Sequence, residues 1–174
     1  LAWWPCILPA YLILLLVIRD VSPKWAFYWG CLQGFLAAGV SLYWLFYLFK
    51  ATAIPLYAIL ALFIGIFSVL CNLNNRHTRS PVARVLVAAM LWTAVEFFRS
   101  ELFILKFSWM TPGLALGPTW VTPWFGVYGT SFLLLAATVL PASAQQVALS
   151  MRDGLVTLDT RNATVRQILT EWAK

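Results

Sequence analysis

Charged residues lie within an otherwise apolar part of the chain, and they are the first candidates for chemistry. Glu96 and Arg99 are three residues apart, and Glu101 follows two positions after Arg99. Residues three apart share one face of a helix, so the spacing predicts a structural ion pair between Glu96 and Arg99. Because charge is costly in hydrocarbon, such residues are kept for packing or for a substrate. The alternative is that Arg99 contacts a lipid phosphate.

Nucleophiles, bases and metal ligands are sparse. The only histidine, His77, follows a run of polar residues and is expected in a solvated loop. Cys6, Cys31 and Cys71 have no metal-ligand spacing and are predicted to be small buried hydrophobic residues. Glu101 is the nearest second carboxylate to Glu96, but it falls beyond the expected helix end. We therefore expect no metal and no cofactor, and we assign no catalytic residue.

Composition places these residues in a membrane. Hydrophobic residues make up 62% of the chain and charged residues 10%, which leaves more apolar surface than a soluble domain of 174 residues could bury. The net charge is +6, but the basic residues are scattered between apolar runs and are not gathered on one face. Nucleic acid is therefore not an expected partner.

The fold class predicted from this pattern is all-α, a polytopic transmembrane helix bundle of about five spans with a short α+β-like soluble tail. Ser80 is predicted to cap the fourth apolar block, with Pro81 at its first helical position. Gly30 and Gly34 share one helix face and are predicted to serve close helix packing. The expected blocks are Ala2 to Ile18, Trp25 to Phe49, Ala51 to Leu70, Pro81 to Phe98 and Trp124 to Leu140.

The segment from Ser100 to Pro123 is rich in proline, glycine and tryptophan, which is typical of a loop that touches the membrane. Most of the aromatic residues there are predicted to lie in a belt at the membrane–water interface. The alternative for one or two of them is that they line a groove through which lipid enters. The candidates for lipid or head-group contact are Arg99, Trp109 and Tyr128.

The distribution of basic residues predicts the orientation. Arg19 and Lys24 lie on the same side of the predicted bundle as the arginines of the loop two spans later, and this side is expected to be cytoplasmic. The region from Glu96 to Pro123 would then face outward, on the side opposite the cytoplasm. Those later arginines are Arg76, Arg79 and Arg84.

The tail differs from the rest of the chain. Residues 1–140 form the predicted membrane domain, and residues 141–174 an unrelated polar tail that resembles the start of an exported domain. Within the tail, a β-like run covers Gly154 to Leu158 and an amphipathic helical run covers Thr164 to Trp172.

Several short motifs, in their order and spacing, resemble the membrane domain of apolipoprotein N-acyltransferase. They are Gly39-Val40-Ser41-Leu42-Tyr43-Trp44-Leu45, Trp92-Thr93-Ala94-Val95-Glu96-Phe97-Phe98-Arg99, Phe107-Ser108-Trp109, and Gly126-Val127-Tyr128-Gly129-Thr130-Ser131-Phe132. The similarity covers about Leu1 to Leu140. Ser108 stands where the family has proline.

The resemblance implies a bacterial inner-membrane enzyme that moves an acyl chain from phospholipid to the amino group of a lipoprotein's N-terminal cysteine. It also implies a nitrilase-like domain with catalytic Glu, Lys and Cys residues, and no position of this chain matches them. We therefore expect a membrane scaffold that is inactive alone, as in a truncated or fused gene, with phospholipid and lipoprotein as its partners.

Two other functions remain open at this stage. The chain could be a small non-enzymatic membrane anchor that displays its tail. It could also be a binding or transport protein in which Glu96 and Arg99 face a pore, although a pore needs polar residues at several depths and few are present.

Overall fold

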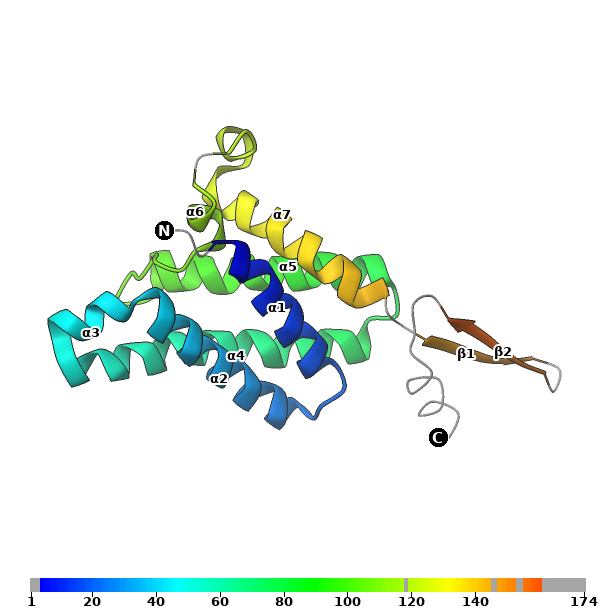
Figure 1. Ribbon diagram of the computed structural model, residues 1–174. Coiled ribbons are helices and arrows are strands. Elements are labelled where there is room, and N and C mark those ends of the chain that lie inside the picture. The colour runs from blue at the N-terminus through cyan, green and yellow to red at the C-terminus, as the bar shows by residue number, and fades with distance from the viewer. Residues whose placement is uncertain (1–3, 118, 145–146, 153–154, 161–174) are drawn as a thin grey trace.

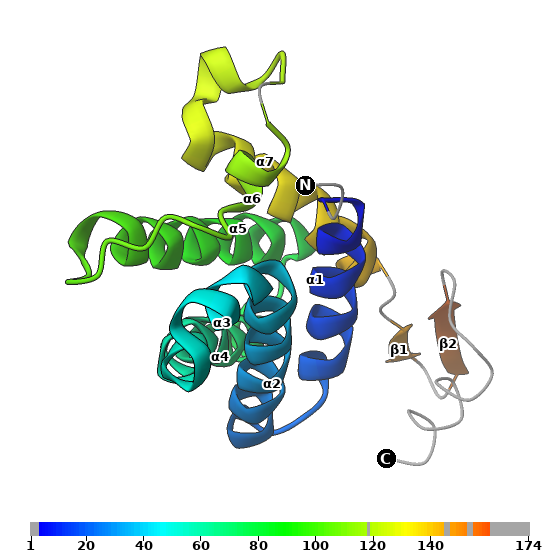
Figure 2. The same cartoon turned by 60° about the vertical axis from the view of Figure 1, so that its left-hand side comes forward.

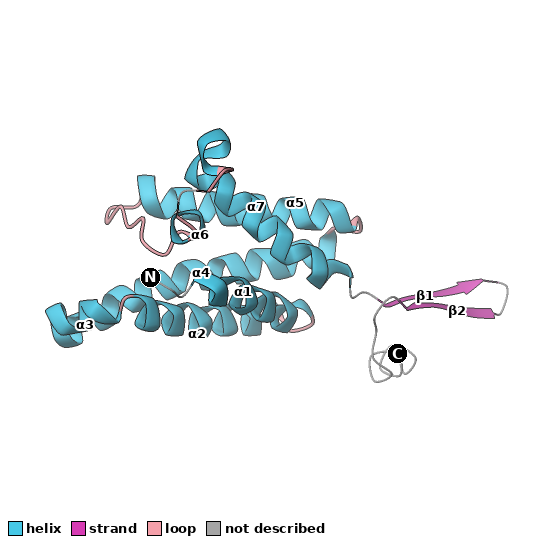
Figure 3. Ribbon diagram, turned by 45° about the horizontal axis from the view of Figure 1, so that its top comes forward, coloured by secondary structure: helices cyan, strands magenta, loops and turns pink. Residues whose placement is uncertain are grey.

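The chain folds into a bundle of helices, as a computed structural model shows for residues 4–117, 119–144, 147–152 and 155–160. Helices dominate these residues, which confirms the predicted all-α membrane bundle (Figures 1 and 3). The longer helices are α1 (Trp4–Arg19), α2 (Pro23–Ser41), α4 (Ala53–His77), α5 (Pro81–Phe97) and α7 (Thr122–Ala144). The shorter ones are α3 (Tyr43–Phe49), the 3-10 turn η1 (Lys50–Thr52), the π-helical turn η2 (Phe98–Leu102) and α6 (Pro112–Ala115).

Helix pairs build the bundle. α5 packs against α7, and α2 runs beside α4 (Figure 1). α1 contacts α2, α4 and α7, and the turned view in Figure 2 shows it beside α2 and near the end of α7. The main apolar core lies where α1, α4, α5 and α7 meet. There Trp92 forms T-shaped ring contacts with Tyr11 and Phe67, with centroid distances of 4.7 and 4.9 Å.

Three segments within the described residues are long and apolar enough to cross a membrane: Tyr43–His77, Pro81–Leu102 and Thr122–Leu140. The sequence predicted about five spans, so this number is smaller. The described apolar part of α1, Pro9–Arg19, is shorter than a span. α2 is long enough, but Lys24, Gln33 and its glycines make it less apolar than the three segments.

The predicted block Trp25 to Phe49 is two helices instead of one. It breaks at Leu42, whose backbone has φ −114° and ψ 25°. The Leu42 carbonyl accepts a hydrogen bond from the Tyr57 hydroxyl of α4 at 2.7 Å. A tertiary contact thus accompanies the break, and the chain reverses a few residues later at Lys50, which has a positive φ of 52°.

Glycines allow α2 and α4 to approach closely. A Cβ placed on Gly30 would lie 2.9 Å from the Cα of Gly65, and one on Gly34 would lie 2.9 Å from the Cα of Ala61. Both distances are too short for real carbon atoms, so a side chain at either position would push the helices apart. Gly39, farther along α2, has nothing within 4 Å of such a Cβ.

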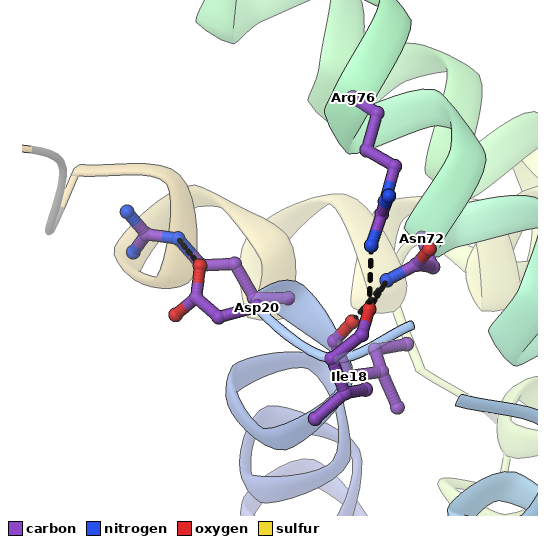
Figure 4. A network of polar contacts seen from close by, with 6 residues as sticks. Ile18, Asp20, Asn72 and Arg76 are labelled. Carbon is purple, nitrogen blue, oxygen red and sulfur yellow. Dashed lines mark hydrogen bonds and ion pairs between the residues drawn. The ribbon is translucent and has the colours of Figure 1, made fainter. Parts of the chain in front are cut away.

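A polar network ties the turn between α1 and α2 to the end of α4 (Figure 4). The buried Asn72 amide donates to the carbonyls of Ile18 and Val21, and Arg76 donates to the Val21 carbonyl at 2.8 Å. Arg19 and Asp20 form an ion pair at 3.7 Å beside it. The bond to Ile18 satisfies a carbonyl that the end of α1 leaves without a helical partner, and the bonds to Val21 satisfy a carbonyl of the turn that follows.

We expect Asn72→Leu to lower the free energy of unfolding by about 2 kcal/mol, because the buried Ile18 carbonyl loses its donor, whereas the Val21 carbonyl keeps the bond from Arg76. Thermal or denaturant unfolding in detergent micelles measures this loss. Asn75→Leu is the matched control, since Asn75 is only half-buried and its side chain makes no hydrogen bond to a described residue. Equal losses for the two variants would contradict the role given to Asn72.

The tail contains an antiparallel hairpin of β1 (Val147–Arg152) and β2 (Leu155–Thr160), in which Val147 pairs with Thr160. The predicted β-like run therefore lies in a strand, apart from Gly154, which is outside the described residues. The predicted helical run from Thr164 to Trp172 also lies outside them.

Candidate functional site

The end of α5 carries the two charged residues that the sequence singled out. α5 begins at Pro81, and the Ser80 hydroxyl accepts from the Ala83 amide as an N-cap. The helix then continues into the π-helical turn η2. Glu96 is 1% exposed and Arg99 is 3% exposed, so both side chains lie inside the protein. Neither forms part of the surface.

Glu96 and Arg99 do not form the direct ion pair that their spacing predicted. Within the described residues, the ion pair closer than 4.0 Å is Arg19 with Asp20. Glu96 and Arg99 still act on each other through their charges. The reason for the difference is that Arg99 lies in η2, where the wider π-helical turn changes the angle between residues three apart.

Groups from other elements surround the Glu96 carboxylate. Ser131 of α7 and Thr111, just before α6, are the hydroxyl side chains that lie beside it, and both are fully buried. The Ser131 hydroxyl also accepts a hydrogen bond from the Gly113 amide at 2.9 Å. Thr111 donates to the Ser108 carbonyl at 2.6 Å. Glu96 therefore lies where α5, α6 and α7 converge.

The approach of α6 to α7 requires glycine. A Cβ on Gly113 would collide with the Val127 carbonyl and lie 2.9 Å from the Ser131 hydroxyl oxygen. α7 itself is kinked at Gly126, which has φ 65° and ψ −173° inside the helix. This left-handed backbone suits glycine. Gly113 thus lets α6 pack closely on α7, and Gly126 allows the kink in α7.

Several polar atoms in this cluster are buried without a hydrogen-bond partner in the protein. They are both carboxylate oxygens of Glu96, Nε and one terminal nitrogen of Arg99, Oγ of Ser100, and Nε1 of Trp92. Tyr11 of α1 completes the surroundings, because its ring contacts Trp92 and its hydroxyl feels the charges of Arg99 and Glu96. We call these residues the polar cluster: Tyr11, Trp92, Glu96, Arg99, Ser100, Thr111 and Ser131.

The remaining predicted lipid-contact residues lie nearer the surface. The Tyr128 hydroxyl donates to the Glu101 carboxylate at 2.8 Å, and its ring packs edge-on against Phe97. Trp109 is 44% exposed and packs on Trp44 of α3 at a centroid distance of 4.9 Å. The structure thus brings Tyr128 near Arg99, whereas Trp109 packs against the start of α3.

Sequence reasoning missed Thr111, Ser131 and Tyr11 as members of the cluster. Thr111 precedes a proline and Ser131 lies within an apolar helix, and both look like ordinary cap or packing residues. The signal that could have indicated them was the small polar pair Thr130-Ser131 within an otherwise apolar span. Polar residues at membrane depth usually find a polar partner.

The described residues hold no group of three or more His, Cys, Asp or Glu residues that could bind a metal. Cys71 lies in the apolar core and Cys31 packs against Gly65. His77 is exposed, with its ring nitrogen 2.9 Å from the Leu73 carbonyl. The chemistry that this site offers is therefore charge and hydrogen bonding inside a helix bundle.

Comparison with known proteins gives a consistent assignment. The family described as the apolipoprotein N-acyltransferase N-terminal domain matches residues 1–140. The apolipoprotein N-acyltransferase of Pseudomonas aeruginosa (strain LESB58) is 28% identical over 152 residues, covering 79% of this chain and 30% of that protein. The enzyme of Azotobacter vinelandii is 29% identical over 151 residues, covering 79% and 29%. The chain thus spans about 30% of the length of these relatives. No solved structure matches it.

Proposed function

The chain belongs to the apolipoprotein N-acyltransferase N-terminal domain family, and from this premise we propose that its helices form the scaffold on which a lipoprotein receives an acyl chain. The acyl donor would be a membrane phospholipid, and the acceptor the N-terminal cysteine of a lipoprotein. The observation that carries this proposal is the family match over residues 1–140. The apolar helices and the buried polar cluster are consistent with it.

The proposed location is the bacterial inner membrane, with the Glu96 to Pro123 region facing the periplasm. The support is that basic side chains gather at the opposite end of the bundle. Arg76 bonds to the turn after α1, and Arg84 of α5 donates to the carbonyls of Thr78 and Arg79. Arg19 and Arg84 are close enough to repel each other. Such clustering is typical of a cytoplasmic side.

Tyr128 and Trp109 are the residues we propose for contact with phospholipid head groups. Both are amphipathic aromatic residues that are partly exposed next to the ends of spanning helices. Arg99 was a third candidate. Because its side chain is 3% exposed, we assign it to the interior; its backbone carbonyl accepts a hydrogen bond at 3.2 Å from the amide of Phe107, two residues before Trp109.

A transport function fits the structure less well. A pore needs polar residues at several depths along facing helices. Among the described residues, most buried polar atoms without a partner gather at the end of α5, and Gln33 and Asn72 contribute the others. An anchor function has no observation of its own in its favour.

A domain exchange tests the proposed function. Residues 1–140 of this chain would replace the matching region of the Pseudomonas aeruginosa enzyme, in cells depleted of their own enzyme. We expect the chimera to restore N-acylation of lipoproteins, measured by mass spectrometry of their N-terminal peptides. We expect the 174-residue chain alone to leave acylation absent, since its described cysteines lie in helix contacts.

The control is the amount of chimera in the membrane fraction, because a chimera that does not accumulate is uninformative. A second chimera carrying Gly39→Ala, a position with free space, checks that the exchanged region tolerates a harmless change. A chimera that accumulates normally and fails to acylate would refute the scaffold function. Acylation by the chain alone would refute its dependence on other catalytic residues.

A further inference from the structure

We infer that the polar cluster encloses a binding site for water, in which bound water links the Glu96 carboxylate to the Arg99 guanidinium. The site lies between α5, η2, α6 and α7. It concerns the interior of the bundle and does not depend on the proposed acyl transfer.

The first step is the hydrogen-bonding deficit. Both Glu96 oxygens, two Arg99 nitrogens, Ser100 Oγ and Trp92 Nε1 are buried and have no partner within the protein. A buried polar group without a partner is costly, and a buried charge more so. Native proteins satisfy nearly all such groups, and those without a protein partner are usually bonded to buried water.

The second step is geometry. Trp92, Glu96 and Ser100 follow one another at intervals of four residues, which aligns them along one side of α5 and its continuation into η2. Arg99 lies in the same turn as Ser100. The unpartnered atoms therefore come from consecutive turns of one helix.

The third step is the choice of ligand. Glu96 supplies acceptors, whereas Arg99 and Trp92 supply donors, and a hydroxyl such as Ser100 can do either. A simple anion would be repelled by Glu96 and a simple cation by Arg99. The described residues also lack a metal-binding group here. Water is neutral and both donates and accepts, so it matches this mixed set.

The fourth step is the link to neighbouring elements. The Ser131 hydroxyl lies beside the carboxylate and accepts from the Gly113 amide, which leaves its own hydrogen free to donate to bound water. Thr111 is likewise placed beside the carboxylate. Bound water would thereby connect α5 to the loop before α7 and hold that loop in place.

Radiolytic hydroxyl-radical labelling of the full chain in detergent micelles tests the site, because radicals formed from bound water oxidise the side chains next to it. Trp92 is the reporter, and Phe67 is the matched control. Phe67 contacts the same indole at 4.9 Å, but it is 0% exposed and lies in the apolar core. After correction for intrinsic reactivity, we expect Trp92 to be oxidised several times faster than Phe67.

Equal rates for Trp92 and Phe67 in the unmodified chain would overturn the proposal, because they would mean a dry cluster. Two variants give a second measurement. Glu96→Gln keeps hydrogen-bonding capacity and should retain most of the Trp92 labelling. Glu96→Leu fills the site with an apolar side chain and should reduce the labelling severalfold. Unchanged labelling in a folded Glu96→Leu protein would also contradict a site built on this carboxylate.

Discussion

Replacing Glu96 with leucine is expected to destabilise the bundle by about 3–5 kcal/mol, the range found when one partner of a buried charge pair is removed. Arg99 is 3% exposed and would keep its charge in an apolar interior without the carboxylate. Leucine is similar in size to glutamate, so the loss would come from charge and hydrogen bonding and not from a cavity. Unfolding in detergent micelles measures the change.

Further variants separate charge from packing. Glu96→Gln keeps the shape and the hydrogen-bonding groups, and it should cost less than Glu96→Leu. Arg99→Leu alone should also be strongly destabilising, because it leaves the carboxylate without its opposite charge. The double variant Glu96→Leu with Arg99→Leu should cost clearly less than the two single losses added together. Strict additivity would mean that the two charges are independent, contrary to their mutual interaction here.

Gly34→Leu is expected to have the second largest effect. A side chain there would meet the backbone of Ala61 and the side chain of Ile64, both at 2.9 Å. Neither the backbone of α4 nor a branched side chain can move aside easily, so the two helices must separate. We expect the free energy of unfolding to fall by about 3 kcal/mol, at the upper end of the range for overpacked cores.

Gly39→Leu is the matched control for this variant. It lies in the same helix, and a Cβ there meets nothing within 4 Å. Leucine has a higher helix propensity than glycine, so the control should be neutral or slightly stabilising. Thermal unfolding of both variants in detergent micelles makes the comparison. Similar transition temperatures for the two would show that the contact between α2 and α4 does not depend on the missing side chain.

Much of the bundle could be predicted from the sequence because its signals are local. The absence of charge over long stretches indicates helices in a membrane, since hydrocarbon excludes charge. Ser80 and Pro81 mark the start of α5 as predicted, because capping involves only neighbouring residues. The predicted bounds of the fourth and fifth apolar blocks agree with those of α5 and α7 within a few residues. The resemblance in short motifs agrees with the family match over residues 1–140.

Only the tertiary structure determined which polar groups meet. Leu42 breaks a predicted helix where Tyr57, 15 residues later, bonds to its carbonyl. Ser131 and Thr111 lie beside Glu96 from other elements, and Arg99 of η2 makes no direct ion pair with the carboxylate. Helical periodicity describes one element at a time. Contacts between distant residues depend on how helices pack, which is why the sequence identified the charges and the fold determined that they are buried together.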